Sequence, residues 1–132
     1  MKMTIRNLKW ISYAVLLLMA GTVVAGQSTV DEDFMQVMED RQKSLSSNIS
    51  LKNSQAATED VKELQEMFND VEAYYAHKGN ASDAVDWSRE SKALTVAIEK
   101  YVASKDFDTA SQTSVTLAKT CKTCHRVYKK DA

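Results

Sequence analysis

The chain contains no proline, and its only glycines are Gly21, Gly26 and Gly79, so few residues in it interrupt a helix. From residue 26 onward no segment alternates apolar and polar residues in the manner of a half-buried strand. Apolar residues recur instead at spacings of three and four, which align side chains along one face of a helix. The sequence therefore predicts an all-α protein.

Capping residues and short polar stretches divide this region into four predicted helices. The first covers residues 29–51, with Thr29 as N-cap and Glu32 completing a capping box, and the second covers 58–78, with Thr58 as N-cap. The third begins at residue 82 or 83 and ends before a connection at 105–108, and the fourth covers 109–128. Because short loops join them, consecutive helices should be antiparallel, as in an up-down-up-down four-helix bundle.

The apolar spacing also predicts which side chains face inward. These positions are Val30, Phe34, Val37 or Met38, Leu45 and Ile49 in the first helix, Val61, Leu64, Phe68, Val71 and Tyr75 in the second, Trp87, Leu94, Ile98 and Tyr101 in the third, with Ala97 and Val102 beside them, and Ala110, Ser114, Leu117, Cys121, Cys124 and Tyr128 in the fourth.

Residues 1–25 have the features of an export signal. Lys2, Arg6 and Lys9 precede an almost wholly apolar stretch, and Val23 and Ala25 supply the small residues that a signal peptidase accepts. Cleavage after Ala25 would leave residues 26–132 as one periplasmic domain without stable membrane association. The alternative is a retained anchor, because the apolar stretch reaches the short end of what can cross a bilayer.

The most specific motif is Cys121-Lys122-Thr123-Cys124-His125. This Cys-x-x-Cys-His spacing is typical of covalent attachment of a c-type haem, in which two thioether bonds hold the porphyrin and the histidine ligates its iron. On a helix the two cysteines share a face, and His125 lies about 100° round from Cys124. The motif predicts one covalent haem c, with His125 as the proximal ligand of its iron.

Two other uses of the cysteines fit less well. A dithiol redox site favours a helix N-terminus, where the thiol pKa falls, but this pair lies deep in a helical pattern. A structural zinc site needs four ligands, and the second histidine, His77, is far upstream in the sequence. At the end of the second helix, His77 is better interpreted as an exposed residue that stabilises the helix C-terminus.

Charge is unevenly distributed along the chain. The full sequence has a net charge of −1, which becomes −4 without residues 1–25, and residues 119–132 carry +4 against −8 for 26–118. This positive end could steer an acidic redox partner, or it could simply complement the macrodipole of the last helix. Nucleic-acid binding is not expected of an acidic protein without a basic groove.

A four-helix bundle with a single Cys-x-x-Cys-His near its C-terminus resembles the cytochrome c′ family, including its low-spin cytochrome c-556 relatives. The resemblance covers essentially all of residues 26–132 and includes further positions. These are the Arg41-Gln42 pair with Leu45 three residues beyond it, Trp87 at the start of the third helix, and the pattern His125-x-x-Tyr128-Lys129.

The resemblance implies site residues and two functions. Arg41 would pair with a haem propionate, and Leu45, which cannot donate an electron pair, would face an open distal site that binds NO or CO. The alternative is a six-coordinate electron carrier with a methionine from the first helix as sixth ligand, Met38 or Met35, while Met67 of the second helix could also compete. Electron transfer with redox partner proteins and a possible homodimer are further implications, whereas enzymatic activity is not expected, because the sequence offers no distal acid–base group.

Overall fold

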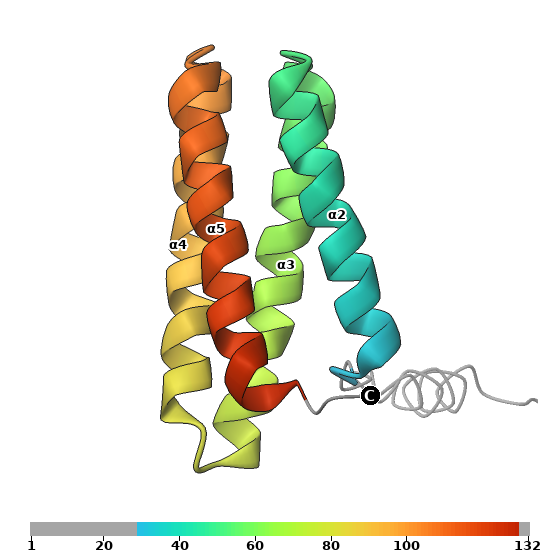
Figure 1. Cartoon of the computed structure of the whole chain (residues 1–132), viewed down its shortest axis with the longest axis vertical. Helices are drawn as coiled ribbons and strands as arrows, with labels where there is room; N and C mark the ends of the chain where they lie inside the picture. The colour runs from blue at the N-terminus through green and yellow to red at the C-terminus, as the bar shows by residue number, and fades with distance from the viewer. Residues whose placement is uncertain (1–28, 130–132) are drawn as a thin grey trace, which may run out of the picture.

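The structure is a computed structural model that describes residues 29–129. Over these residues it contains helices and no strand, in the order α2 (Glu32–Ser50), α3 (Ser54–Lys78), α4 (Ser82–Ala103) and α5 (Phe107–Tyr128). Consecutive helices run in opposite directions, and α5 returns to contact α2, so the helices form a closed ring (Figure 1). The predicted all-α, up-down-up-down four-helix bundle is confirmed over this range.

The predicted signal peptide, residues 1–25, lies outside the described residues. Within residues 29–129 no helix combines the length and the apolar character needed to cross a membrane.

Three helices begin at a different residue from the one predicted. In each case the side chain of a nearby Asp or Asn accepts the hydrogen bond that caps the helix N-terminus. The N-cap of α2 is Asp31, whose carboxylate accepts from the Phe34 N–H at 2.9 Å, rather than Thr29. Asn53 rather than Thr58 caps α3, so residues predicted as loop belong to its first turn. Asp106 caps α5 by accepting from the Thr109 N–H at 3.1 Å, which begins the helix two residues early. Short acidic and amide side chains at the N-cap satisfy otherwise unpaired N–H groups.

The helix connections are short and each contains a residue with positive φ. Gly79 follows α3, as predicted, with φ 71° and its N–H bonded to the Tyr75 carbonyl at 3.2 Å. Lys52, Asn80 and Lys105 adopt φ values of 54°, 53° and 64° in the three connections. These left-handed residues end each helix abruptly and let the next one return alongside.

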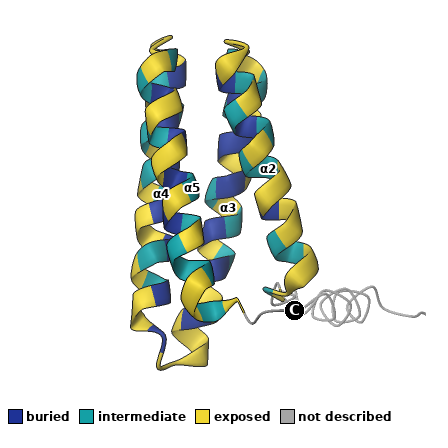
Figure 2. Ribbon diagram, in the orientation of Figure 1, coloured by how far each residue is buried: buried dark blue, intermediate teal, exposed yellow. Residues whose placement is uncertain are grey.

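The core runs along the inward faces of all four helices (Figure 2). The predicted stripe of α3 is confirmed in full: Val61, Leu64, Phe68, Val71 and Tyr75 are all buried. In α2 the choice between Val37 and Met38 is settled, since Val37 is 52% exposed and Met38 only 7%.

The prediction for α4 was partly wrong. Trp87, Leu94 and Tyr101 are only half-buried. The buried face consists mainly of small and polar residues at spacings of four and three, namely Ala84, Ser88, Ser91, Thr95, Ile98 and Val102. Burial of two hydroxyls is compensated within the helix, because Ser88 donates to the Ala84 carbonyl at 2.7 Å and Thr95 to the Lys92 carbonyl at 2.6 Å. Small side chains on this face also let α4 lie close to its neighbours.

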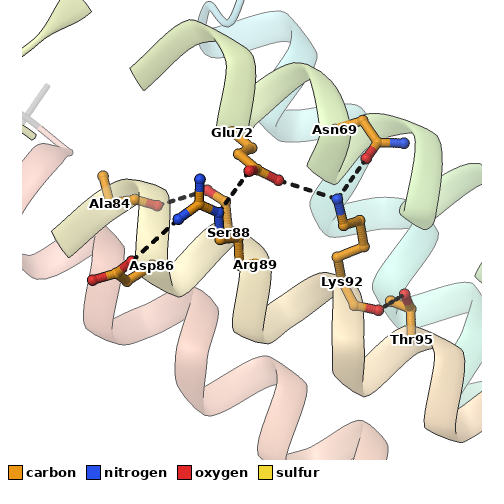
Figure 3. Close-up of polar contacts among 8 residues, drawn as sticks. All are labelled: Asn69, Glu72, Ala84, Asp86, Ser88, Arg89, Lys92 and Thr95. Atoms are coloured by element: carbon orange, nitrogen blue, oxygen red, sulfur yellow. Dashed lines mark hydrogen bonds and ion pairs between the residues drawn. The ribbon is translucent and has the colours of Figure 1, made fainter. Parts of the chain in front are cut away.

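A polar network ties α3 to α4 on the outside of the bundle (Figure 3). The Glu72 carboxylate accepts from Arg89 Nε at 2.7 Å and from Lys92 Nζ at 3.1 Å, and Lys92 also donates to Asn69 at 2.9 Å. Partly exposed ion pairs of this kind contribute at most about 1 kcal/mol each. The network therefore fixes the register of the two helices more than it stabilises the fold.

Candidate haem-attachment site

A cavity of about 720 Å³ lies in one half of the bundle. Its walls come from the first half of α2, the second half of α3, the start of α4 and the last three turns of α5. These segments share the end of the bundle that carries the α3–α4 connection (Figure 1). The α2–α5 pair has the sparsest contacts of the four neighbouring pairs, which leaves room between these two helices.

The motif residues Cys121, Cys124 and His125 all line this cavity. Each is half-buried, and the two cysteines pack against the core. Helical spacing explains why both sulfurs face the same space, since residues three apart share a face. The structure thus brings the three predicted haem-binding groups to one wall.

Burial is the main influence on the protonation states of Cys121, Cys124 and His125. It raises the pKa of the Cys121 and Cys124 thiols to about 11 each, so both are neutral at pH 7. Burial, followed by the positive charge of Lys129, lowers the pKa of His125, which keeps its imidazole neutral as a metal ligand must be. Reactive redox cysteines have lowered pKa values instead, so this environment argues against a dithiol redox site.

Methionine side chains of α2 line the same cavity. Met38 is buried and Met35 half-buried, and both are cavity-lining residues. Apolar side chains of α3, among them Leu64, Phe68 and Val71, complete this part of the lining. A thioether sulfur is an established axial ligand of haem iron, so two donors of that type reach the cavity from a different helix than His125.

Aromatic residues form another part of the lining. The Tyr128 ring lies 4.9 Å from that of Tyr75 and 6.5 Å from that of Trp87, measured between centroids. The Tyr128 hydroxyl donates a hydrogen bond to Asp83 near the start of α4, and this bond raises the pKa of Tyr128 to about 12. The last turn of α5 is thereby fastened to α4 beside the cysteines.

Exposed lysines are also among the lining residues, namely Lys43, Lys78, Lys122 and Lys129. Gln42 lines the cavity as well, and its amide donates to Ser46 Oγ at 3.2 Å and to the Ser114 carbonyl of α5 at 3.5 Å. Ammonium groups beside a largely apolar space are suited to carboxylates of a bound molecule, although Asp31, Glu32 and Glu39 of α2 also line this cavity.

Two residues of the predicted site lie elsewhere. Leu45 has no exposed surface and belongs to the core beyond the cavity. Arg41 contacts carboxylates of α3, with Nη1 2.8 Å from Asp60 and Nη2 2.6 Å from Glu63, and does not line the cavity. Because a buried carboxylate must be paired, Asp60 holds the guanidinium away from the site that the resemblance gave it.

Sequence reasoning missed several cavity residues, among them Ser88 and Ser91 of α4. Their signal was the unbroken spacing of four and three from Ala84 to Val102, which marks an inward face even where the residues are polar. Their small side chains leave space opposite α2 where a larger residue would fill it. His77 is exposed at the end of α3 and does not line the cavity.

The donor set fits a covalently attached haem. Two neutral thiols and an imidazole share one wall, and thioether and apolar side chains line much of the rest. The lining also includes exposed lysines and the carboxylates of Asp31, Glu32 and Glu39. Within residues 29–129 no cluster of three or more His, Cys, Asp or Glu side chains is placed to hold a metal ion by itself. No protein-family model, curated protein or solved structure matches the chain.

Proposed function

We propose that this protein is an exported, periplasmic monohaem c-type cytochrome that transfers electrons. The observation that carries the proposal is that Cys121, Cys124 and His125 line one largely apolar cavity of about 720 Å³. The volume lies within the range of roughly 300–1,000 Å³ that is usual for small-molecule and cofactor sites. The resemblance to the cytochrome c′ family and the predicted export signal support the same function.

In this proposal each group of the wall has one role. The sulfurs of Cys121 and Cys124 form the two thioether bonds, and the imidazole of His125 is the proximal ligand. A haem, when bound, supplies the one-electron ferric/ferrous couple. The apolar side chains of α3 exclude water, and two of the cavity-lining lysines that form no ion pair with described residues, namely Lys78, Lys122 and Lys129, pair with the propionates. Arg41 does not take this role because Asp60 and Glu63 engage it, and Lys43 does not because it pairs with Glu39.

We further propose that a methionine of α2 is the sixth ligand. Met35 and Met38 line the cavity and Leu45 does not, which favours a six-coordinate electron carrier over the open, NO- or CO-binding site that Leu45 would imply. Thioether ligation raises the reduction potential of haem iron and suits electron transfer.

The first test is covalent attachment. Protein exported in a host that attaches c-type haem should keep its pigment after denaturation and extraction with acidified solvent, and the double variant Cys121→Ala/Cys124→Ala should lose it completely. Loss of pigment from the unmodified protein in the same extraction would contradict the proposal.

The second test concerns the sixth ligand. Either Met35→Leu or Met38→Leu should remove the methionine-to-iron charge-transfer band and convert a low-spin ferric spectrum to high-spin. Met67→Leu is the matched control, because Met67 is half-buried on α3 but does not line the cavity. A high-spin spectrum in the unmodified protein would instead support the open site, with NO or CO as its ligand.

A further inference from the structure

We propose that the outer face of the last three turns of α5 is a docking surface for an acidic partner protein. The surface, here called the basic stripe, consists of Lys119, Lys122, Arg126 and Lys129, all exposed. Their spacings of three, four and three place them along one side of the helix. The inference rests on the proposed function, since an electron carrier must meet its partner near its cofactor.

The cations of the basic stripe form no ion pairs with the described residues, although Glu39 of α2 lies within electrostatic range of Lys129. No member of the stripe forms an ion pair within residues 29–129. The same is true of Lys62, Lys78 and Lys100, but each of the other helices also has paired cations or acids that pair, among them Arg41, Lys43, Arg89 and Lys92. The sequence explains the difference, because no Asp or Glu occurs between Asp108 and Asp131. Like charges three and four residues apart destabilise a helix slightly, so pairing along α5 does not account for gathering them here.

The helix macrodipole accounts for only part of the stripe. Its effect is confined to about the last turn of a helix, which here includes Arg126 and ends at Tyr128, with Lys129 as C-cap. Lys119 and Lys122 lie more than one turn before that end. The macrodipole therefore does not explain the positions of Lys119 and Lys122.

The basic stripe borders the cavity. Lys122 and Lys129 are cavity-lining residues, and the intervening positions of the same turns are Cys121, Cys124 and His125. A macromolecule held against the stripe would thus cover the margin of the cavity, where an electron would leave or enter.

Charge complementarity identifies the occupant as a protein with an acidic patch. Residues 29–118 carry a net charge of −8, so a broad anionic membrane that approached the stripe would also meet acidic helices and be repelled. A partner whose acidic patch matches the stripe in size avoids this repulsion. Such complementarity mainly accelerates encounter and weakens with salt.

The test compares two charge-reversal variants with the same net charge. Lys119→Glu/Arg126→Glu alters the stripe without touching cavity-lining residues. Lys62→Glu/Lys100→Glu is the control, because both lysines are exposed on α3 and α4 and form no ion pair with described residues. The probes are immobilised poly-L-glutamate, which imitates an acidic protein surface, and phosphatidylglycerol vesicles.

We expect the loaded protein and the control to bind poly-L-glutamate with an affinity that falls as salt rises. The stripe variant should bind about tenfold more weakly or worse. Equal weakening in both variants would overturn the proposal, because net charge alone would then explain binding. Tighter binding to vesicles than to poly-L-glutamate would overturn it in favour of a membrane.

Pigment retention, measured on the same preparations, separates this inference from the proposed function. Covalent pigment without stripe-dependent binding refutes the docking surface alone. Stripe-dependent binding by a protein that carries no pigment supports the surface and refutes the cytochrome proposal.

Discussion

The two halves of the bundle differ in how they complete their core. In the half that carries the α2–α3 and α4–α5 connections, the side chains of Leu45, Ile49, Ile98 and Val102 are at most 1% exposed. In the cavity half, Met38, Phe68, Val71 and Tyr75 are 4–7% exposed and adjoin the cavity or its lining. Protein interiors are normally close-packed. The side chains of the first half fill its core, whereas those of the second half leave the core open at the cavity.

This difference links the fold to the proposed function. The closed half, as we call the first, can hold the helices in register before any cofactor is present, because it needs nothing beyond the chain. The cavity half has apolar walls that a covalent haem would cover. We therefore expect the stability of the closed half to be independent of the cofactor and that of the cavity half to depend on it.

Truncating one core residue in each half gives the largest expected effect. In cofactor-free protein, Leu45→Ala should lower the free energy of unfolding by about 2–5 kcal/mol, because it opens a cavity in a close-packed region. Met38→Ala should lower it less, since Met38 already adjoins open space. Urea denaturation of both variants measures the two costs.

Repeating these measurements on the pigmented protein provides the control. The cost of Leu45→Ala should be unchanged by the cofactor, while that of Met38→Ala should rise. Equal costs for the two variants in the cofactor-free protein would show that the halves do not differ in packing.

The same comparison explains what could be predicted from the sequence. From Val61 to Tyr75 the apolar positions of the inward face of α3 were predicted correctly, because large apolar side chains mark each turn. The buried Ala57 and Asp60 before them were not predicted. The face of α4 was predicted only in part, since Ser88, Ser91 and Thr95 are polar and leave no hydrophobic signal, although the hydroxyls of Ser88 and Thr95 are satisfied within the helix. These three residues would have been found by continuing the spacing of three and four from the other inward positions of α4, whatever the residue type.

The candidate site was predictable to the extent that it depends on one helix. The spacing of Cys121, Cys124 and His125 fixes their relative directions wherever α5 lies. What faces them depends on the register of α2 against α5, which no local pattern encodes. Leu45 therefore fell outside the cavity, while Met35 and Met38, considered only as alternatives, line it.

A polar cluster joins α2 to α3 outside the cavity lining, and its loss should have an intermediate effect. The buried carboxylate of Asp60 accepts hydrogen bonds from Arg41, Ser44 and Asn48 at 2.7–2.8 Å. Asp60→Asn replaces an acceptor oxygen with an amide donor among these donors, so it should lower the free energy of unfolding by about 1–3 kcal/mol.

The matched control for this prediction is Glu63→Gln. Glu63 contacts the same guanidinium, but its side chain is 52% exposed, and its loss should cost less than about 1 kcal/mol. Shifts of the urea midpoint compare the two variants. If Glu63→Gln proved as costly as Asp60→Asn, burial of the carboxylate would not be the source of the effect.

The smallest expected effect concerns the exposed side of the cavity half, where Glu72 joins α3 to α4 (Figure 3). Hydrogen bonds from Arg89 and then Lys92 lower the pKa of Glu72 below its ordinary value of 4.5. Because the folded state favours the ionised form, this stabilisation is present above about pH 4.5 and is lost as pH falls through the lowered pKa.

Glu72→Gln should therefore reduce the free energy of unfolding at pH 7 by at most about 1 kcal/mol, and its difference from the unmodified protein should shrink as the pH falls below 4.5. Thermal unfolding from pH 7 to pH 3 measures this convergence.

Glu90→Gln is the control, since Glu90 is exposed on α4 and forms no ion pair with residues 29–129, and it should show no such trend. A difference for Glu72→Gln that stays constant with pH would mean that Arg89 and Lys92 hold the side chain by hydrogen bonds alone. In that case the charge of Glu72 would contribute nothing to the stability of the α3–α4 contact in the cavity half.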